Sequence, residues 1–283
     1  MASPAARMIN MFQQLEQSGE VDEVREIAEG VVLVRGLGKY LHLDREVQRQ
    51  LETSYPVRRK DDEIVWGEAQ WVEGDNAALM YRGRELRRGN MWFQEGDPKV
   101  LKRFLRYDYP GWQYRVLPAT SDINRCPELK PTYDAYNALV TSADPTWKAN
   151  HVIVTHYKDA EAMIGMHSDR TRSIVAESLI TVVKTGDVGR TFRITSLDGE
   201  TELFNEVVEP GDAIVMTLEA NARTKHGVPE LAGQVVAPSG SIVFRSIKEW
   251  YKWEDLEKRE EAKKRKHDAE EEQQQREDLK RQA

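Results

Sequence analysis

The region from residue 150 to residue 246 contains short runs of β-branched and other apolar residues, and this rhythm constrains the fold more than any other feature. The runs span 151–156, 178–183, 191–195, 213–216 and 241–244, with Gly, Asp and Pro residues between them. Short strands separated by turn-forming residues are typical of an all-β sandwich or barrel. We therefore expect residues 150–250 to form a jelly-roll core.

The chain before this region has a mixed pattern. Residues 1–28 suggest a polar lead-in that is helical from about Met8, and 30–36 suggest a short strand that ends at a glycine. Apolar residues spaced four apart predict a helix over 43–55, and 131–140 also has a helical pattern. We assign residues 29–149 to an N-terminal region that precedes the core. The expected fold class is α+β, with a jelly-roll double-stranded β-helix (cupin-like) core.

The C-terminal segment, residues 251–283, consists almost entirely of charged and amide side chains after Trp253. It contains too few apolar residues for a coiled-coil seam, so we expect a solvated single helix or a disordered tail. The run of basic residues at 263–266 fits a nuclear localisation signal, but the solvated face of a charged helix is the favoured interpretation.

Composition excludes several functional classes. The chain has a formal net charge of −7, which is not the signature of a strong nonspecific DNA-binding protein. No apolar run approaches the ~20 residues that a membrane span needs. Cys126 is the only cysteine, so we expect no internal disulfide, no disulfide-linked partner and no zinc site with several thiolates. An intracellular location, cytoplasmic or nuclear, fits best.

The sequence His167-Ser168-Asp169 carries the first candidate site. On a strand, residues i and i+2 project from the same face, so this imidazole and this carboxylate can converge on one ion. His226 would complete a facial triad of two histidines and one carboxylate, the ligand set of non-heme Fe(II) oxygenases. The alternative for His167 and Asp169 is a simple surface pair.

Arg245 ends the run 241–245, where Ser241, Val243 and Arg245 share one face because side chains alternate along a strand. A buried arginine on the inner face of a barrel needs an anionic partner. Its guanidinium group suits the carboxylate of an oxo-acid, although a structural ion pair is an equally good interpretation of Arg245 alone.

Three blocks of this region resemble the motifs of the AlkB family of 2-oxoglutarate-dependent Fe(II) dioxygenases. Residues 151–169 are similar to the family pattern N-x-Y-x-D-G-x-D-x-I-x-x-H-x-D. Residues 211–216, followed by His226-Gly-Val-Pro229, resemble G-[SD]-x-x-x-M with a later H-x-[VIL]-P. Residues 237–245 resemble the final R-x-N-x-T-x-R strand.

The resemblance implies that His167, Asp169 and His226 hold Fe(2+), with 2-oxoglutarate and O2 as co-substrates. It also implies that Arg245 and Tyr157 bind a carboxylate of 2-oxoglutarate. No catalytic residue is expected beyond the metal ligands.

The chain departs from the family pattern where Thr155, Ser239 and Ser241 replace its Asn, Arg and Asn. We assign Ser241 to co-substrate binding. We expect Lys184 to replace the arginine that is absent at position 239, as a strand lysine does in some related dioxygenases. The alternative for Lys184 is a solvated lysine at a strand edge.

The implied reaction is hydroxylation of a C–H bond, which on an N-methyl group releases formaldehyde. The resemblance also implies a substrate lid within residues 29–149 and a modified nucleobase in DNA or RNA as the substrate. A flipped base needs aromatic faces and cations, and both residue types interleave before residue 110. The arginines assigned to the substrate are Arg84, Arg87, Arg88, Arg106 and Arg170. The alternatives are a protein or small-molecule hydroxylase of the same superfamily, or a binding protein that keeps the fold without catalysis.

Overall fold

The structure is a computed structural model of the chain. It describes residues 2–43, 46–55, 57–58, 71–72, 80–81, 84–85, 88–105, 121–231 and 238–252, together with residues 254, 258, 261, 262, 265 and 269.

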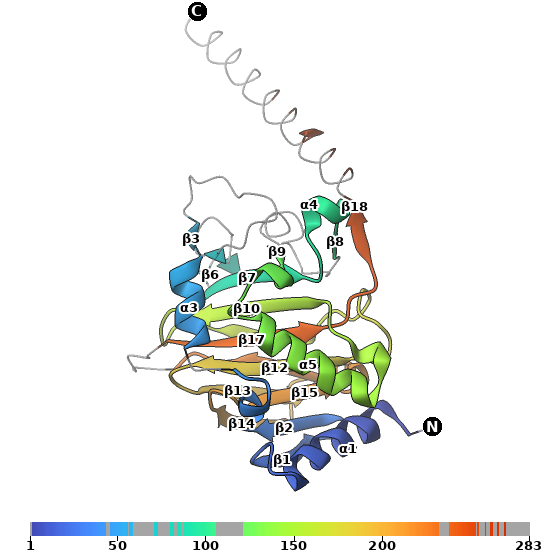
Figure 1. The fold of residues 1–283 in the computed structure, drawn as a ribbon. Coiled ribbons are helices and arrows are strands. Elements are labelled where there is room, and N and C mark those ends of the chain that lie inside the picture. Colours follow the sequence, from blue (N-terminus) through green and yellow to red (C-terminus); the bar gives the residue numbers. More distant parts are fainter. Residues whose placement is uncertain are drawn as a thin grey trace, which may run out of the picture.

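Helices and short strands make up the N-terminal half (Figure 1). They are α1 (Pro4–Gln17), β1 (Glu23–Ala28), β2 (Val31–Arg35), α2 (Leu37–Tyr40), α3 (Val47–Ser54), β3 (Val57–Arg58), β4 (Trp71–Val72), β5 (Met80–Tyr81), β6 (Arg84–Glu85), β7 (Arg88–Gln94), α4 (Pro98–Leu101), β8 (Arg103–Leu105), β9 (Ser121–Asp122), the 3-10 helix η3 (Ile123–Arg125) and α5 (Lys130–Ala143).

Strands dominate the C-terminal half. The elements are the 3-10 helix η4 (Pro145–Trp147), β10 (His151–Tyr157), β11 (Ile164–His167), β12 (Leu179–Gly186), β13 (Arg190–Ser196), β14 (Glu202–Val208), β15 (Ala213–Thr217), α6 (Leu218–Arg223), β16 (Thr224–Val228), β17 (Ser239–Arg245) and β18 (Trp250–Lys252).

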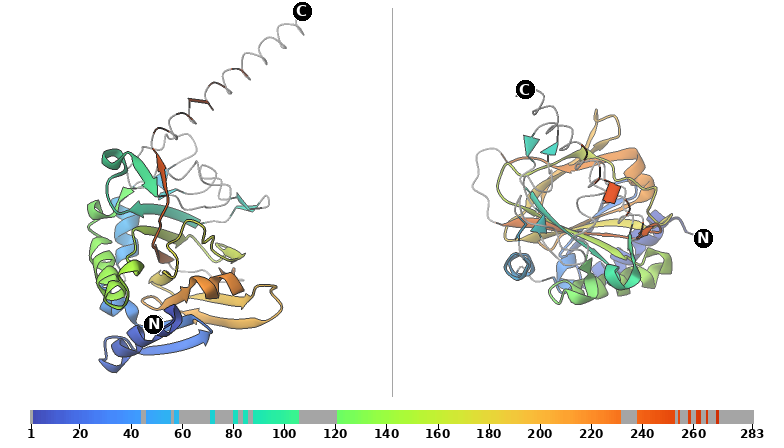
Figure 2. Two further views of the ribbon diagram at one scale, coloured as in Figure 1. Left: turned by 90° about the vertical axis from the view of Figure 1, so that its right-hand side faces the viewer. Right: turned by 90° about the horizontal axis from the view of Figure 1, so that it is seen from above.

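Two sheets face each other and form the core of the molecule (Figure 2). Among the described residues, the larger sheet has the order β1-β2-β15-β12-β17-β10-β7-β4-β3, and the smaller sheet has the order β11-β16-β13-β14. Strands β12, β17 and β10 pair antiparallel in the middle of the larger sheet. This arrangement confirms the α+β class with a jelly-roll core, and every run predicted as a strand after residue 150 lies in one.

Strands β2, β15, β12, β17, β10 and β7 of the larger sheet divide their side chains between two apolar cores. The outer core lies between this sheet and helices α1, α3 and α5, and it contains Phe12, Ile242 and Phe244. The inner core lies between the two sheets and contains Val243 and Phe192. Because residues 242 and 243 point to opposite faces, β17 supplies both cores and presents its alternate polar residues to the interior.

The polar composition of residues 1–28 conceals a packed element. Helix α1 begins at Pro4, where Ser3 caps it by accepting a hydrogen bond from the Ala6 amide at 3.2 Å. Met8, Met11 and Phe12 recur at helical spacing and are fully or almost fully buried. Burying a side chain such as Phe12 contributes about 1.5–3 kcal/mol, so this segment is part of the core rather than a lead-in to it. The helix predicted over 43–55 begins later, at Val47.

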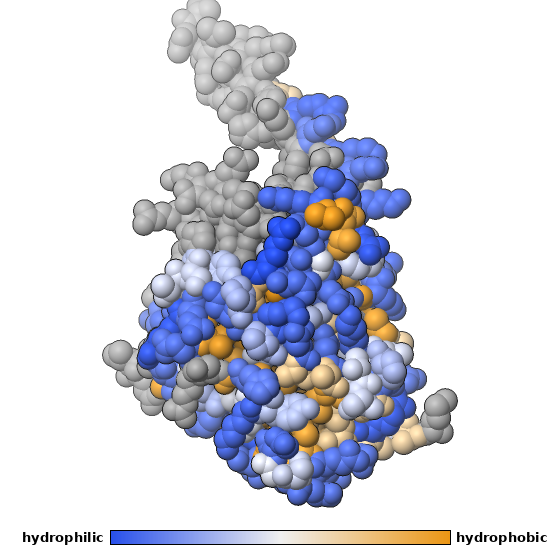
Figure 3. Space-filling view, viewed as in Figure 1, coloured by the Kyte–Doolittle hydropathy of each residue, from blue (hydrophilic) through white to orange (hydrophobic). Residues whose placement is uncertain are grey.

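The surface agrees with the charged composition. Figure 3 shows a largely hydrophilic face with a small apolar area at α4, where Val100 is 73% exposed. In the part of the chain that the structure describes, no helix combines the length and the apolar character needed to cross a membrane. Cys126 is buried and forms no disulfide, and burial raises the pKa of its thiol to about 12.

Candidate metal centre and co-substrate pocket

The smaller sheet brings two histidines side by side. Strand β11 ends at His167, which pairs with His226 on β16, and their imidazole ring centroids are 4.5 Å apart. Asp169 lies two residues beyond the end of β11, and its Oδ1 is 3.5 Å from Nε2 of His167. The ligand atoms of the three residues all lie within 4.8 Å of one another, and no other such group occurs among the described residues.

The tautomer of His167 suits metal binding. Its Nδ1 lies 2.8 Å from the carbonyl oxygen of Gly165. A carbonyl oxygen can only accept, so Nδ1 carries the hydrogen and the lone pair of Nε2 points toward Asp169. Two imidazoles and one carboxylate on one side of an ion are the donor set of non-heme Fe(II) oxygenases, and these residues therefore fit that metal.

The carboxylate of Asp169 is held in its charged form. Burial alone would raise its pKa, but the positive charge of Arg245 holds the pKa well below the usual range. Arg245 donates from Nε and Nη2 to Oδ2 of Asp169 at 2.9 and 2.6 Å. Because both bonds go to Oδ2, Oδ1 faces the two histidines.

His226 is buried beside the aromatic ring of Phe192, with ring centroids 5.9 Å apart and planes inclined by 11°. Burial, together with the nearby positive charge of Arg245, lowers the pKa of His226 to about 3. The imidazole is therefore neutral at physiological pH, which is the form that binds a metal.

A cavity between the two sheets opens from this centre. It is lined by three residues assigned to the co-substrate from the sequence, namely Tyr157, Ser241 and Arg245, together with His167, Asp169 and His226. The register of β10 and β17 places these polar side chains on the inner face, because His151 pairs with Arg245 and Thr155 pairs with Ser241.

Lys184 lies in the middle of the larger sheet, on β12, where it pairs with Ser241. It is only 1% exposed, so it is not a solvated lysine at a strand edge. Its Nζ is 4.9 Å from the centre of the Tyr157 ring and has no hydrogen-bond partner among the described residues. Burial and the positive charge of Arg190 lower the pKa of Lys184 to about 7.

Arg190 is a second buried cation at this end of the cavity, and sequence reasoning did not single it out. Its guanidinium group lies 5.1 Å from the centre of the Tyr157 ring. It donates to the carbonyl oxygens of Asp159, Ala162 and Pro229 at 2.9, 2.6 and 3.2 Å. Tyr157 thus has two cationic neighbours, and no carboxylate of the described residues bonds to either cation.

The arginines assigned to the substrate have different positions. Arg88 is buried on β7, lines the cavity and donates to the carbonyl oxygen of Met163 at 3.1 Å. Arg170 is exposed directly after Asp169. Arg84 lies in β6, but its side chain is outside the described residues, as are Arg87 and Arg106.

Asn90 was also not identified from the sequence as a cavity residue, although the local pattern indicates the strand on which it lies. Residues 88–94 alternate between polar and apolar side chains at their start, which is the pattern of a strand with one polar face. Asn90 lines the cavity and accepts a hydrogen bond from Thr155 at 2.7 Å. The two other histidines of β10 face opposite ways, with His151 beside Arg245 and His156 against Trp71.

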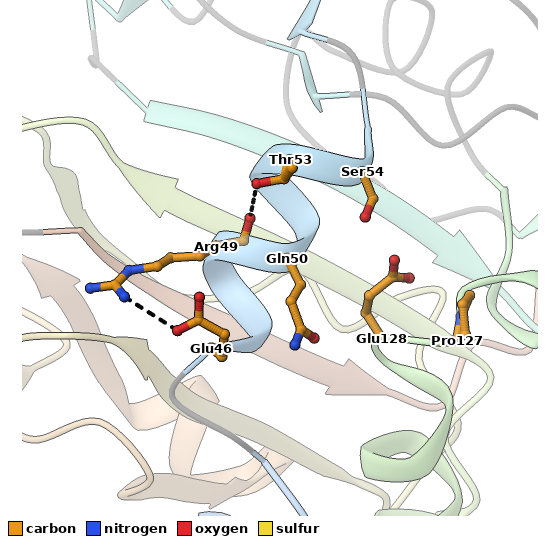
Figure 4. Close-up of a pocket in the computed structure, with 7 residues that line it drawn as sticks. All are labelled: Glu46, Arg49, Gln50, Thr53, Ser54, Pro127 and Glu128. Atoms are coloured by element: carbon orange, nitrogen blue, oxygen red, sulfur yellow. Dashed lines mark hydrogen bonds and ion pairs between the residues drawn. The ribbon is translucent and has the colours of Figure 1, made fainter.

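A second hollow lies far from this chemistry, between α3 and residues Pro127 and Glu128 (Figure 4). Its polar groups satisfy one another, since Arg49 pairs with Glu46 at 3.3 Å and Thr53 donates to the Arg49 carbonyl at 2.8 Å. It contains no group of metal ligands, so the cavity between the sheets is the better candidate for an active site.

Comparison with known proteins agrees with this choice. A family model described as the 2OG-Fe(II) oxygenase superfamily matches residues 96–272. The fold is similar to the solved structure of OsALKBH1, with a TM-score of 0.50 and 13% sequence identity over 78% of this chain and 100% of that one. Among curated proteins, none matches the chain in sequence.

Proposed function

The chain belongs to the 2OG-Fe(II) oxygenase superfamily, and we propose that His167, Asp169 and His226 are its Fe(II) ligands. The protein is a dioxygenase whose cofactor is Fe(2+) and whose co-substrates are 2-oxoglutarate and O2. The bound metal supplies the oxidising chemistry, coupled to conversion of 2-oxoglutarate to succinate and CO2. One observation carries the ligand assignment, namely the convergence of these ligand atoms within 4.8 Å beside the cavity.

The pocket residues divide between the two carboxylates of 2-oxoglutarate. Arg245 lies at the metal end and binds the carboxylate next to the metal, with Ser241 beside it. Lys184 binds the far carboxylate, and Tyr157 donates its hydroxyl hydrogen to the same group. The support is electrostatic, because a buried lysine without an acidic partner is costly until an anion neutralises it.

Direct titration of 2-oxoglutarate into the Mn(II)-loaded protein under anaerobic conditions tests this assignment. We expect Lys184→Met to weaken 2-oxoglutarate binding roughly 10- to 100-fold, since a hydrogen bond to a charged group contributes about 1.5–3 kcal/mol. Lys39→Met, which removes a surface lysine paired with Asp22 at 2.7 Å, is the matched control. If the two variants bind 2-oxoglutarate with equal affinity, Lys184 has a structural role only.

The substrate that we propose is a modified nucleobase in DNA or RNA, from which an N-methyl group is removed oxidatively. The resemblance of the three sequence blocks to the AlkB family motivates this choice. Arg170 and Arg172 add to it, because both are exposed directly after a proposed ligand and neither pairs with an acid among the described residues. Exposed cations this close along the chain to a proposed metal ligand suit phosphate groups.

Release of succinate and formaldehyde with methylated oligonucleotides tests the substrate. Changing Arg170 and Arg172 together to Ala should weaken oligonucleotide binding and reduce the slope of log affinity against log salt by about 1–2. Arg193→Ala, at a surface arginine paired with Glu202, is the control. Turnover that couples to a peptide or small molecule but not to any oligonucleotide would favour a hydroxylase of that class. No succinate release with any substrate would favour a binding protein that lacks catalysis.

A further inference from the structure

Asp169 lies outside the strand that positions its neighbour. The ladder between β11 and β16 ends at the pair of His167 with His226, so no strand pairing fixes residues 168 and 169. Beyond this pair, hydrogen bonds from side chains hold the chain in place. Ser168 donates from Oγ to the carbonyl oxygen of Thr224 at 2.6 Å.

Asn221 holds the backbone of Asp169 on both sides. Its Oδ1 accepts a hydrogen bond from the Asp169 amide at 2.8 Å, and its Nδ2 donates to the Asp169 carbonyl at 2.9 Å. A side-chain amide carries one acceptor and two donors, so it imitates the peptide group of a neighbouring strand. The Asn221 amide therefore extends the hydrogen-bond pattern of β11 beyond its last pair with β16.

The position of Asn221 along the chain gives this contact a functional meaning. It is 1% exposed and lies on α6, the short helix that leads directly into β16 and His226. The two hydrogen bonds join segments 52 residues apart in sequence. One rigid link thus connects the backbone that carries the Asp169 carboxylate to the element that carries His226.

We propose that Asn221 is a positioning residue that sets the distance between the Asp169 carboxylate and the His226 imidazole for metal binding. This inference rests on the proposed assignment of His167, Asp169 and His226 as ligands. Without the amide, the backbone of residues 168–169 keeps no side-chain partner except through Ser168, and the Asp169 carboxylate is held from its far side by Arg245 alone. Outer partners of metal ligands typically change metal affinity by 10–100-fold.

Co(II) binding to the metal-free protein, followed by its visible absorption, measures this effect without turnover. We expect Asn221→Ala to weaken Co(II) binding by at least tenfold. The control is Thr217→Ala, which removes the N-cap of the same helix, a 3.1 Å bond to the Ala220 amide, without touching Asp169. Thr217→Ala should lower Tm while it leaves Co(II) affinity within about twofold of wild type.

The variant Asn221→Asp tests whether the hydrogen-bond donor of Asn221, rather than the volume of its side chain, matters for metal binding. It keeps the size of the side chain but replaces the donor with an oxygen that faces the Asp169 carbonyl. Its added negative charge alone would strengthen cation binding, so weaker Co(II) binding supports positioning. Asn221 variants that bind Co(II) as tightly as Thr217→Ala would overturn the inference. Failure of the wild-type protein to bind Co(II) would instead overturn the ligand assignment itself.

Discussion

Arg245 and Lys184 are both buried cations on the inner face of the larger sheet, yet their surroundings are opposite. Arg245, on β17, makes two hydrogen bonds to the Asp169 carboxylate. Lys184, on the adjacent strand β12, has no hydrogen-bond partner among the described residues and has Arg190 nearby. One cation is neutralised within the protein, and the other is not.

The difference shows how the two ends of the pocket contribute to ligand binding. At the metal end, Arg245 holds Asp169 charged before any ligand arrives, so the carboxylate is ready to bind a cation. At the far end, the buried charge of Lys184 destabilises the empty protein, and an anionic ligand relieves that cost. The stability of the ligand-free protein therefore depends on these two residues in opposite directions.

Arg245→Ala should produce the largest effect. Removing one partner of a buried ion pair costs about 3–5 kcal/mol, because the other charge is left uncompensated. Urea unfolding of the metal-free protein measures this loss. In the double variant with Asp169→Ala, we expect much less than the sum of the two single losses. Arg193→Ala, at an exposed pair, should cost about 0–1 kcal/mol, and an equal loss in both would contradict the comparison.

Lys184→Met should have the opposite sign. It replaces a buried cation by an apolar side chain of similar length, so the ligand-free protein should gain stability on the order of a few kcal/mol. The same variant should lose the rise in Tm that 2-oxoglutarate gives the wild-type protein. A ligand-free variant that is less stable than wild type would show that the charge of Lys184 is compensated by the protein after all.

The pH dependence follows from the lowered pKa of Lys184, about 7 against an ordinary value of 10.5. Between these values the unfolded chain binds a proton that the folded protein does not, so stability of the ligand-free protein should rise with pH. Affinity for 2-oxoglutarate should fall as pH rises above about 7, because the ligand needs the charged lysine. Titration calorimetry across this range measures the fall, and Lys184→Met should flatten it.

Ser241→Ala should have the smallest effect. Ser241 lines the cavity between the two cations, and its hydroxyl group is neutral. A neutral hydrogen bond contributes about 0.5–1.5 kcal/mol, which corresponds to at most roughly tenfold in affinity for 2-oxoglutarate. A loss as large as that of Lys184→Met would mean that the hydroxyl network, and not the cation, anchors the co-substrate.

The sequence predicted the parts of this molecule that local patterns determine. Strands β10, β12 and β17 follow from alternation and turn residues. The resemblance to related dioxygenases drew attention to Lys184, whose role in co-substrate binding stays a proposal. The His167 and Asp169 pair was predicted from a period of two along a strand, but β11 ends at His167. Their convergence depends instead on Asn221, a residue that only the folded chain brings there.

Asn90 and Arg190 were missed in the sequence for the same physical reason. Asn90 matters because β7 pairs with β10, and Arg190 matters because β13 lies across the cavity from Tyr157. Such contacts depend on register between distant segments, which no local window contains. Helix α1 was expected from about Met8 and begins at Pro4, but its burial was missed, since averaging over polar residues hid the apolar face of Met8, Met11 and Phe12.

The pairing of β2 with β15 has a consequence for how the protein is made. Val34 pairs with Ala213, and all four residues of 31–34 are completely buried in the finished fold. At about 5–20 residues per second, a ribosome needs on the order of 10–40 s to synthesise the partner of this strand. During that time an apolar strand near the N-terminus has no neighbour on one side. A chain that ends before residue 213 therefore leaves this strand unpaired on that side, and an exposed apolar strand edge favours aggregation.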